Sequence, residues 1–100
     1  MVLIYITCKD IIQAKNISMH LLEKRLIACS NMFPIESMYW WKGKIEEESE
    51  IVLLAKSKDR NFEEIVRQVT KIHSYDVPAI IKIDTESSKD YQDWINKEVD

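Results

Sequence analysis

The sequence contains very few of the residues that form linkers and disulfide frameworks. It has one glycine, two prolines and two cysteines in 100 residues. Because glycine, proline and serine form no clusters, nothing in the chain indicates a linker between domains, a repeat or a low-complexity segment. We therefore expect a single domain over residues 1–100, a length at which one hydrophobic core is sufficient.

Two further absences limit the possible functions. The net charge is −3, so no basic excess favours nucleic acid or anionic lipid as a partner. No apolar run approaches the roughly 20 residues of a membrane-spanning helix. The apolar start, MVLIYIT, ends at Cys8 and lacks the basic residues and cleavage site of a signal peptide. We expect a cytoplasmic protein that binds neither nucleic acid nor membrane.

Apolar periodicity predicts an α+β fold. Asp10 and Asp59 are the predicted N-caps of two amphipathic helices, and Ser88 is that of a last helix. Gly43 lies in the predicted turn between the second and third strands. The order of elements, βαββαβ, predicts a ferredoxin-like antiparallel sheet with a long hairpin and an extra C-terminal helix. The usual strand order, 4-1-3-2, puts Pro34 on an edge strand, where a proline is tolerated. The four strands are predicted at residues 2–6, 29–41, 50–57 and 79–83.

The central strands are apolar on both faces. Residues 2–6 and 51–55 have no polar residue, whereas a half-solvated antiparallel strand alternates. Two helices cover one face, so the other face requires a partner. A strand over residues 29–41 would span roughly 43 Å, so the hairpin either bends at Pro34 or protrudes. We expect a homo-oligomer. The alternative is a monomer in which the C-terminal helix folds across the open face.

Four segments resemble the CutA family of divalent-cation tolerance proteins: RLIACSNMFP (25–34), SMYWWKGKIEEESE (37–50), HSYDVPAI (73–80) and YQDWI (91–95). The resemblance covers essentially the whole chain. It implies a ferredoxin-like protomer, a cytoplasmic homotrimer, and a role in tolerance to copper and other divalent metals. It assigns no catalytic residue and no obligatory cofactor. Because this family is similar in shape to PII-type signal proteins, the alternative is a trimeric regulator that binds a small ligand or an unidentified protein partner in the inter-subunit cleft.

The candidate metal ligands are Cys8, His73 and Cys29. Copper ligands in the family come from a first-strand cysteine and a histidine pair, and of those positions only His73 carries over, since the others match Ile6 and Ile72. Cys8 and His73 fall at the same end of the predicted sheet, and thiolate and imidazole together suit copper or zinc. An ordinary cysteine and a loop histidine are the alternative. Cys29 lies at the opposite end, where a disulfide to Cys8 is not expected, and is either a ligand or a small core residue. Further departures from the family pattern are Ser74, Asp76 and Ala79.

An inter-subunit cleft is the second candidate site. If the hairpin tip packs beside the 73–75 loop of a neighbouring copy, aromatic and polar side chains form a pocket there, with simple interface packing as the alternative. The glutamates at 46–48 and 50 alternate in direction along a strand, so a solvated strand edge is favoured over a metal site. The predicted cleft residues are Tyr39, Trp40, Trp41, Lys56, His73 and Tyr75.

Overall fold

The computed structural model describes all 100 residues and contains one four-stranded antiparallel sheet. The strands lie in the order β2-β3-β1-β4, which confirms the predicted ferredoxin-like α+β fold and its 4-1-3-2 order. No helix is both long and apolar enough to cross a membrane. The elements are β1 (Val2–Cys8), α1 (Ile11–Glu23), β2 (Cys29–Trp41), β3 (Lys44–Ser57), α2 (Phe62–Ile72), β4 (Ile80–Asp84) and α3 (Lys89–Glu98).

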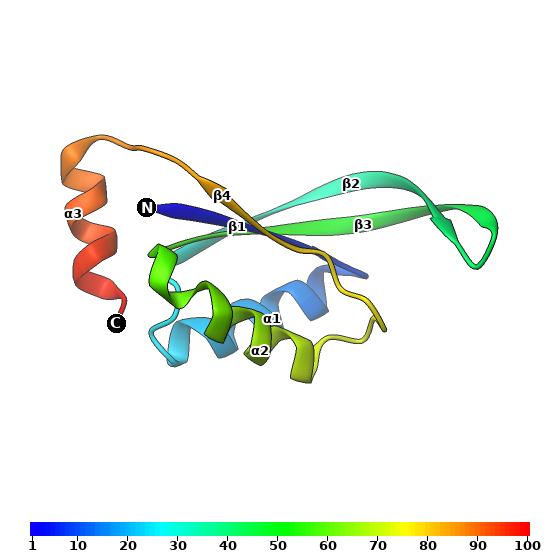
Figure 1. The fold of residues 1–100 in the computed structure, drawn as a ribbon, viewed down its shortest axis with the longest axis horizontal. Coiled ribbons are helices and arrows are strands. Elements are labelled where there is room, and N and C mark those ends of the chain that lie inside the picture. The colour runs from blue at the N-terminus through cyan, green and yellow to red at the C-terminus, as the bar shows by residue number, and fades with distance from the viewer.

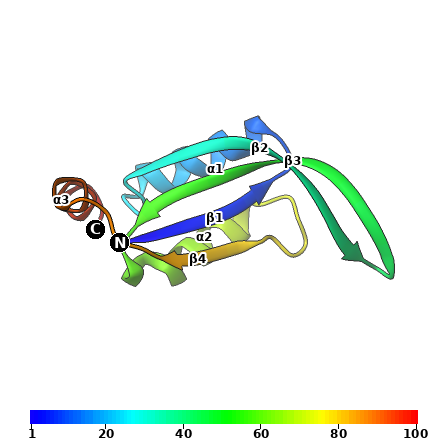
Figure 2. The ribbon, with the colours of Figure 1, turned by 90° about the horizontal axis from the view of Figure 1, so that it is seen from above.

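Helices α1 and α2 cover one face of the sheet and leave the other face open (Figures 1 and 2). The core lies under the covered face. Val2, Ile4 and Ile6 alternate along β1 and are almost fully buried against α1 and α2. Burial of each such side chain contributes about 1.5–3 kcal/mol relative to exposure, so this interface is the main source of stability within one chain.

The three predicted helix N-caps differ in how well they match the structure. Asp10 caps α1, since its Oδ1 accepts a hydrogen bond of 2.8 Å from the backbone N–H of Gln13. The predicted Asp59 cap is wrong: Asp59 begins a short 3₁₀ turn, and α2 starts only at Phe62. The Asp59 carboxylate instead pairs with Lys82 of β4 at 2.5 Å. Ser88 occupies the N-cap position of α3, but its side chain makes no capping hydrogen bond.

The hairpin of β2 and β3 protrudes from the sheet. The molecule is 45 Å along its longest axis and 25 × 21 Å across, and the hairpin curves beyond the ends of β1 and β4 (Figure 2). Its turn has two residues, Lys42 and Gly43, both with positive φ (49° and 79°), as a type I′ turn requires. The third strand begins at Lys44 rather than at the predicted Glu50, because Trp41 pairs with Lys44 and the ladder continues without a break. The fourth strand is shifted by one residue from the prediction.

Candidate functional site

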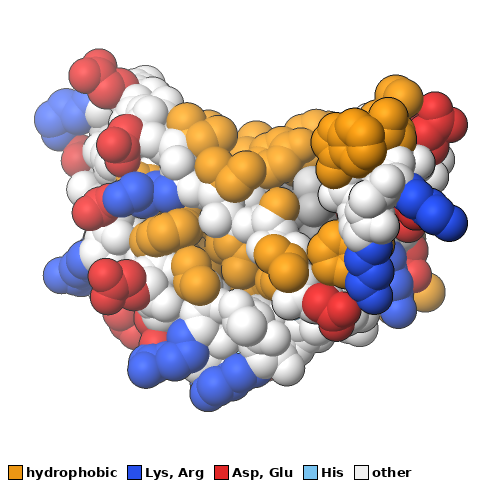
Figure 3. Space-filling model, turned by 45° about the vertical axis from the view of Figure 1, so that its right-hand side comes forward, with side chains coloured by type: hydrophobic (Ala, Val, Ile, Leu, Met, Phe, Trp, Pro, Cys, Tyr) orange, Lys and Arg blue, Asp and Glu red, His pale blue; other side chains and the backbone are white.

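The open face of the sheet is apolar and largely uncovered. Leu3 and Tyr5 of β1 are half-buried there, beside Ile83 and Ile81 of β4, which are 43% and 50% exposed. Phe33 of β2, 41% exposed, lies on the same face on the other side of β3. Hydrophobic side chains gather along a hollow on this side of the molecule (Figure 3). The predicted apolar second face is therefore present in the folded chain.

Helix α3 does not cover this face. It lies at one end of the sheet (Figure 1). There the hydroxyl of Tyr91 is 3.0 Å from the Cys29 sulfur, and Arg25 pairs with Glu98 at 2.8 Å. The arrangement in which the C-terminal helix closes the open face is thus not the one that the chain adopts.

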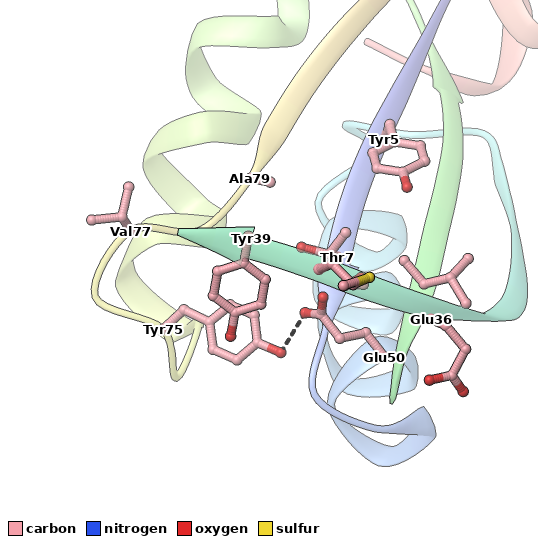
Figure 4. A pocket seen from close by; sticks show the side chains of 11 residues that line it. Tyr5, Thr7, Glu36, Tyr39, Glu50, Tyr75, Val77 and Ala79 are labelled. Carbon is pink, nitrogen blue, oxygen red and sulfur yellow. Dashed lines mark hydrogen bonds between the residues drawn. The ribbon is translucent and has the colours of Figure 1, made fainter. Parts of the chain in front are cut away.

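A cavity of about 530 Å³ lies where the hairpin stem curves past the open face. Four elements supply its walls: β1, the stem of β2, the start of the apolar part of β3, and the loop between α2 and β4 (Figure 4). The cavity contains no lysine, arginine or histidine. Its lining residues are Tyr5, Thr7, Ile35, Glu36, Ser37, Met38, Tyr39, Glu50, Tyr75, Val77 and Ala79.

Glu50 and Tyr75 form the polar centre of this cavity. The Tyr75 hydroxyl donates a hydrogen bond of 2.6 Å to Oε2 of Glu50, whose residue is only 7% exposed (Figure 4). Burial, the hydrogen bond to Glu50 and the charges of Glu50 and Glu48 all raise the pKa of Tyr75, so its phenol stays protonated. Partial desolvation and the nearby glutamates also raise the pKa of Tyr39. Since Glu36 and Glu50 line the cavity and no basic residue does, the charge of its lining is negative.

His73 anchors the loop that carries Tyr75. Its Nδ1 accepts a hydrogen bond of 3.1 Å from the backbone N–H of Tyr75, so Nε2 carries the proton and donates to the carbonyl of Thr7 at 2.8 Å. The imidazole and the Tyr75 ring pack with their centroids 4.6 Å apart. Both ring nitrogens are thus engaged in holding the loop against β1, and neither is free for a metal ion.

The three predicted metal ligands do not form a site within one chain. Cys8 lies near His73 at one end of the sheet, but it is fully buried, and burial and the charges of Glu50 and Asp10 raise the pKa of its thiol to about 12. Cys29 is half-buried at the opposite end. Both thiols are free, and no three His, Cys, Asp or Glu side chains come together. A copper or zinc ion therefore does not fit these donors within one chain, and the ligand assignment stays a prediction.

The predicted cleft residues separate into three groups. Tyr39 and Tyr75 face each other in the cavity (Figure 4). The His73 ring packs against the Tyr75 ring with the centroids 4.6 Å apart. Trp40 and Trp41 lie beyond it at the hairpin tip, 72% and 38% exposed. Lys56 lies at the far end of β3, where its ammonium group donates a hydrogen bond to Oδ1 of Asn31. Since the predicted cleft needs a second copy of the chain, it stays a prediction.

The sequence missed Glu50 as the central residue of the cavity. It follows a run of polar residues and directly precedes the apolar segment Ile51–Ala55. In the register of the sheet it pairs with Ile35 rather than with a charged residue. The available signal was its place as the last carboxylate before the apolar segment of the same strand. Tyr5, Thr7 and Val77 gave no signal, since their contribution depends on the curve of the hairpin.

Comparisons with known proteins agree over the full chain. The family model of the CutA1 divalent ion tolerance protein matches residues 2–98. The divalent-cation tolerance protein CutA of Archaeoglobus fulgidus is 42% identical over 98 residues, 97% of this chain and 96% of that protein. Its counterpart from Pyrococcus horikoshii is 39% identical over 99 residues, 98% of this chain and 97% of that protein.

Solved structures show the same fold at high similarity. The crystal structure of CutA1 from Pyrococcus horikoshii superposes with a TM-score of 0.95 at 38% identity, over 100% of this chain and 99% of that chain. The crystal structure of CutA1 from Oryza sativa superposes with a TM-score of 0.94 at 28% identity, over 99% of this chain and 93% of that chain. The structure from Archaeoglobus fulgidus, described as a periplasmic divalent cation tolerance protein, gives 0.96 at 41% identity over 100% of both chains. Family model, relatives and fold together show that this chain belongs to the CutA1 divalent ion tolerance family.

Proposed function

We propose that this protein acts as a homotrimer in tolerance to divalent cations, that copper is the ion to which it responds, and that it is not an enzyme. The observation that carries the role is the full-length match to relatives named divalent-cation tolerance proteins. None of these names describes a reaction. The cavity also lacks an activated nucleophile, since the nearest thiol, Cys8, is buried and protonated.

The apolar open face supports the homo-oligomer. Monomers rarely expose a contiguous apolar patch larger than a few hundred Å². Here the exposed side chains of Phe33, Ile81 and Ile83 share one face with half-buried Leu3 and Tyr5, and α3 leaves all of them uncovered. Contact with further copies of the chain would remove this surface from water. The proposal of three copies rests on the resemblance to the family.

Metal binding is proposed to depend on assembly. Within one chain, His73 must release either Thr7 or Tyr75 before it can coordinate an ion, and Cys8 must lose a proton in an apolar site. Cys29 is the more accessible thiol. We infer that a soft ion binds where assembly brings Cys29 close to groups of another copy.

Calorimetric titration with Cu(II), Cu(I) and Zn(II) tests the metal proposal. We expect copper to bind the wild-type protein more tightly than millimolar, and Cys29→Ser to weaken this binding by about tenfold or more. Cys8→Ser and His73→Ala serve as comparison variants. Binding no tighter than millimolar would contradict the metal proposal. Copper affinity that is unchanged in Cys29→Ser but lost in the other two variants would move the site to Cys8 and His73.

The cavity favours a second candidate function, that of a regulator that binds a small ligand in a cleft of the trimer. Its volume of about 530 Å³ lies within the usual range of ligand pockets, and its wall includes the nearly buried Glu50. Because Tyr5 and Ile81 pair across β1 and β4, the cavity adjoins the face that assembly is proposed to cover. We therefore expect the affinity of a ligand in this cavity to depend on whether the chain is assembled.

A cytoplasmic location is part of the proposal. Both cysteines are free thiols, which persist most readily in a reducing compartment. Cell fractionation with antibody detection tests the location, and recovery in the periplasmic fraction, as the description of the Archaeoglobus fulgidus protein would suggest, would contradict it.

A further inference from the structure

The cavity beside the hairpin contains a buried negative charge that the chain does not neutralise. Glu50 is only 7% exposed and accepts a single side-chain hydrogen bond, from Tyr75. It takes part in none of the four ion pairs of the protein, and no basic residue lines the cavity. A buried carboxylate is costly unless a positive charge and several hydrogen bonds compensate for it.

The walls of the cavity suit a cation with an apolar body. Three tyrosine rings, Tyr5, Tyr39 and Tyr75, line it, and aromatic faces attract ammonium and guanidinium groups. Ile35 and Val77 add apolar surface for an alkyl chain. A second carboxylate, Glu36, lies in the same wall, where its Oε1 accepts a hydrogen bond of 2.7 Å from the Ser49 hydroxyl. Charge and shape thus select the same class of ligand.

An inorganic divalent ion suits the cavity less well. Hard cations require about six oxygen ligands at short range, and soft ions require sulfur or imidazole. Here Glu50 and Glu36 are the only carboxylates in the lining, and no cluster of three metal-ligating side chains exists in the chain. Much of the remaining wall is aromatic or aliphatic.

We propose that this cavity binds a small organic cation, an alkylguanidinium or alkylammonium compound, whose charged group pairs with Glu50 while its alkyl chain lies against the tyrosine rings. The proposal deepens the second candidate function above and is independent of the metal proposal. A guanidinium group suits the Glu50 carboxylate best because it can donate two parallel hydrogen bonds.

A matched pair of probes tests the charge requirement without any variant. n-Butylguanidinium and n-butylurea have nearly the same shape, but only the first is charged. By calorimetry on the full chain at neutral pH, we expect n-butylguanidinium to bind about tenfold or more tightly than n-butylurea. Equal affinities for the two probes, or no binding of n-butylguanidinium at millimolar concentration, would overturn the proposal.

Two variants locate the site. In Glu50→Gln, which keeps the shape of the side chain, we expect the preference for n-butylguanidinium to fall to within about twofold. Glu63→Gln, which removes an exposed carboxylate from α2, is the matched control and should keep the full preference. A preference that survives Glu50→Gln would place the site elsewhere and refute this assignment.

A third variant distinguishes a free ligand from a lysine of a neighbouring copy. Lys42 and Lys44 flank Gly43 at the exposed hairpin tip. Unchanged affinity in the double variant Lys42→Gln, Lys44→Gln supports a free ligand. An affinity gain of about tenfold would show that a neighbouring lysine already fills the cavity, and would refute a free ligand. Sedimentation of the same samples separates this proposal from the trimer, because a monomer that prefers n-butylguanidinium would refute only the trimer.

Discussion

At the scale of single residues, the Glu50–Tyr75 hydrogen bond is the strongest polar constraint in the cavity. It joins the α2–β4 loop to β3 at 2.6 Å with one partner nearly buried. Tyr75→Phe removes the donor and leaves the carboxylate without a side-chain partner. We expect the free energy of unfolding to fall by about 1.5–3 kcal/mol, measured by urea denaturation at one protein concentration.

Tyr5→Phe is the matched control for this prediction. Tyr5 lines the same cavity, but its hydroxyl donates no hydrogen bond to a protein group. Its loss should change the free energy of unfolding by less than about 0.5 kcal/mol. Similar losses in Tyr75→Phe and Tyr5→Phe would show that the hydrogen bond to Glu50 contributes nothing particular.

Cys8 predicts how stability changes at alkaline pH. Its pKa rises from about 8.5 in an unfolded chain to about 12 in the folded one, so above pH 8.5 the folded state binds more protons than the unfolded state. The stabilising contribution of the neutral thiol is complete below pH 8.5 and is lost as pH rises toward 12. From this group alone, the free energy of unfolding should fall by up to about 1.4 kcal/mol per pH unit.

The Cys8→Ala variant isolates this effect. Denaturation between about pH 8.5 and pH 10, below the range in which most tyrosines ionise, gives the slope for each protein. The variant starts from a lower stability because it lacks a buried side chain, so the slope and not the absolute value is the readout. Equal slopes for wild type and variant would contradict the buried neutral thiol.

The sequence predicted some of the residues that line the cavity, but not that Glu50 lies buried at its centre. Tyr39, His73 and Tyr75 were among the six residues predicted to line a cleft between copies of the chain, which stays a prediction. Within one chain, Tyr39 and Tyr75 line the cavity and His73 packs against the Tyr75 ring. Glu50 was grouped with the solvated glutamates, because strand alternation gives a direction but not the depth of burial. That depth depends on the α2–β4 loop, which folds back over β3 through long-range contacts that local sequence does not encode.

At the scale of elements, the cap of α1 is a local feature that the sequence predicts well. Asp10 accepts a hydrogen bond from Gln13 at 2.8 Å, so Asp10→Ala should lower the free energy of unfolding by about 1 kcal/mol. Ser88→Ala, at an N-cap position without a side-chain hydrogen bond, is the control and should cost less than about 0.5 kcal/mol. Thermal or urea denaturation measures both, and the reverse ranking would contradict the assigned caps.

Two elements differed from prediction for identifiable reasons. The glutamate-rich segment after Gly43 has low strand propensity, yet it is extended, because each residue pairs with β2 across a tight turn. Asp59 is of a residue type that commonly caps helices, but a 3₁₀ turn precedes α2 and the Asp59 carboxylate pairs with Lys82. In both cases the residues make interactions with another strand that their local sequence does not indicate.

At the scale of the whole molecule, topology followed from element order and the position of Pro34. Strand length left two possibilities, a bend at Pro34 or a protruding hairpin, since a strand over residues 29–41 exceeds the width of a compact domain, and the structure shows that the hairpin protrudes. Where α3 lies was left open by the sequence, because its apolar residues fit either an open face or the end of a sheet. The contacts with Cys29 and Arg25 place it at the end. The open face therefore stays uncovered within one chain.

Sedimentation at low micromolar concentration tests whether further copies of the chain cover the open face. We expect a single species with three times the 11.9 kDa mass of one chain, because only assembly removes the exposed side chains of the open face from water. The charge-introducing variant Ile81→Glu, on the exposed part of that face, should shift the distribution toward smaller species. A wild-type protein that sediments at 11.9 kDa would contradict assembly through the open face.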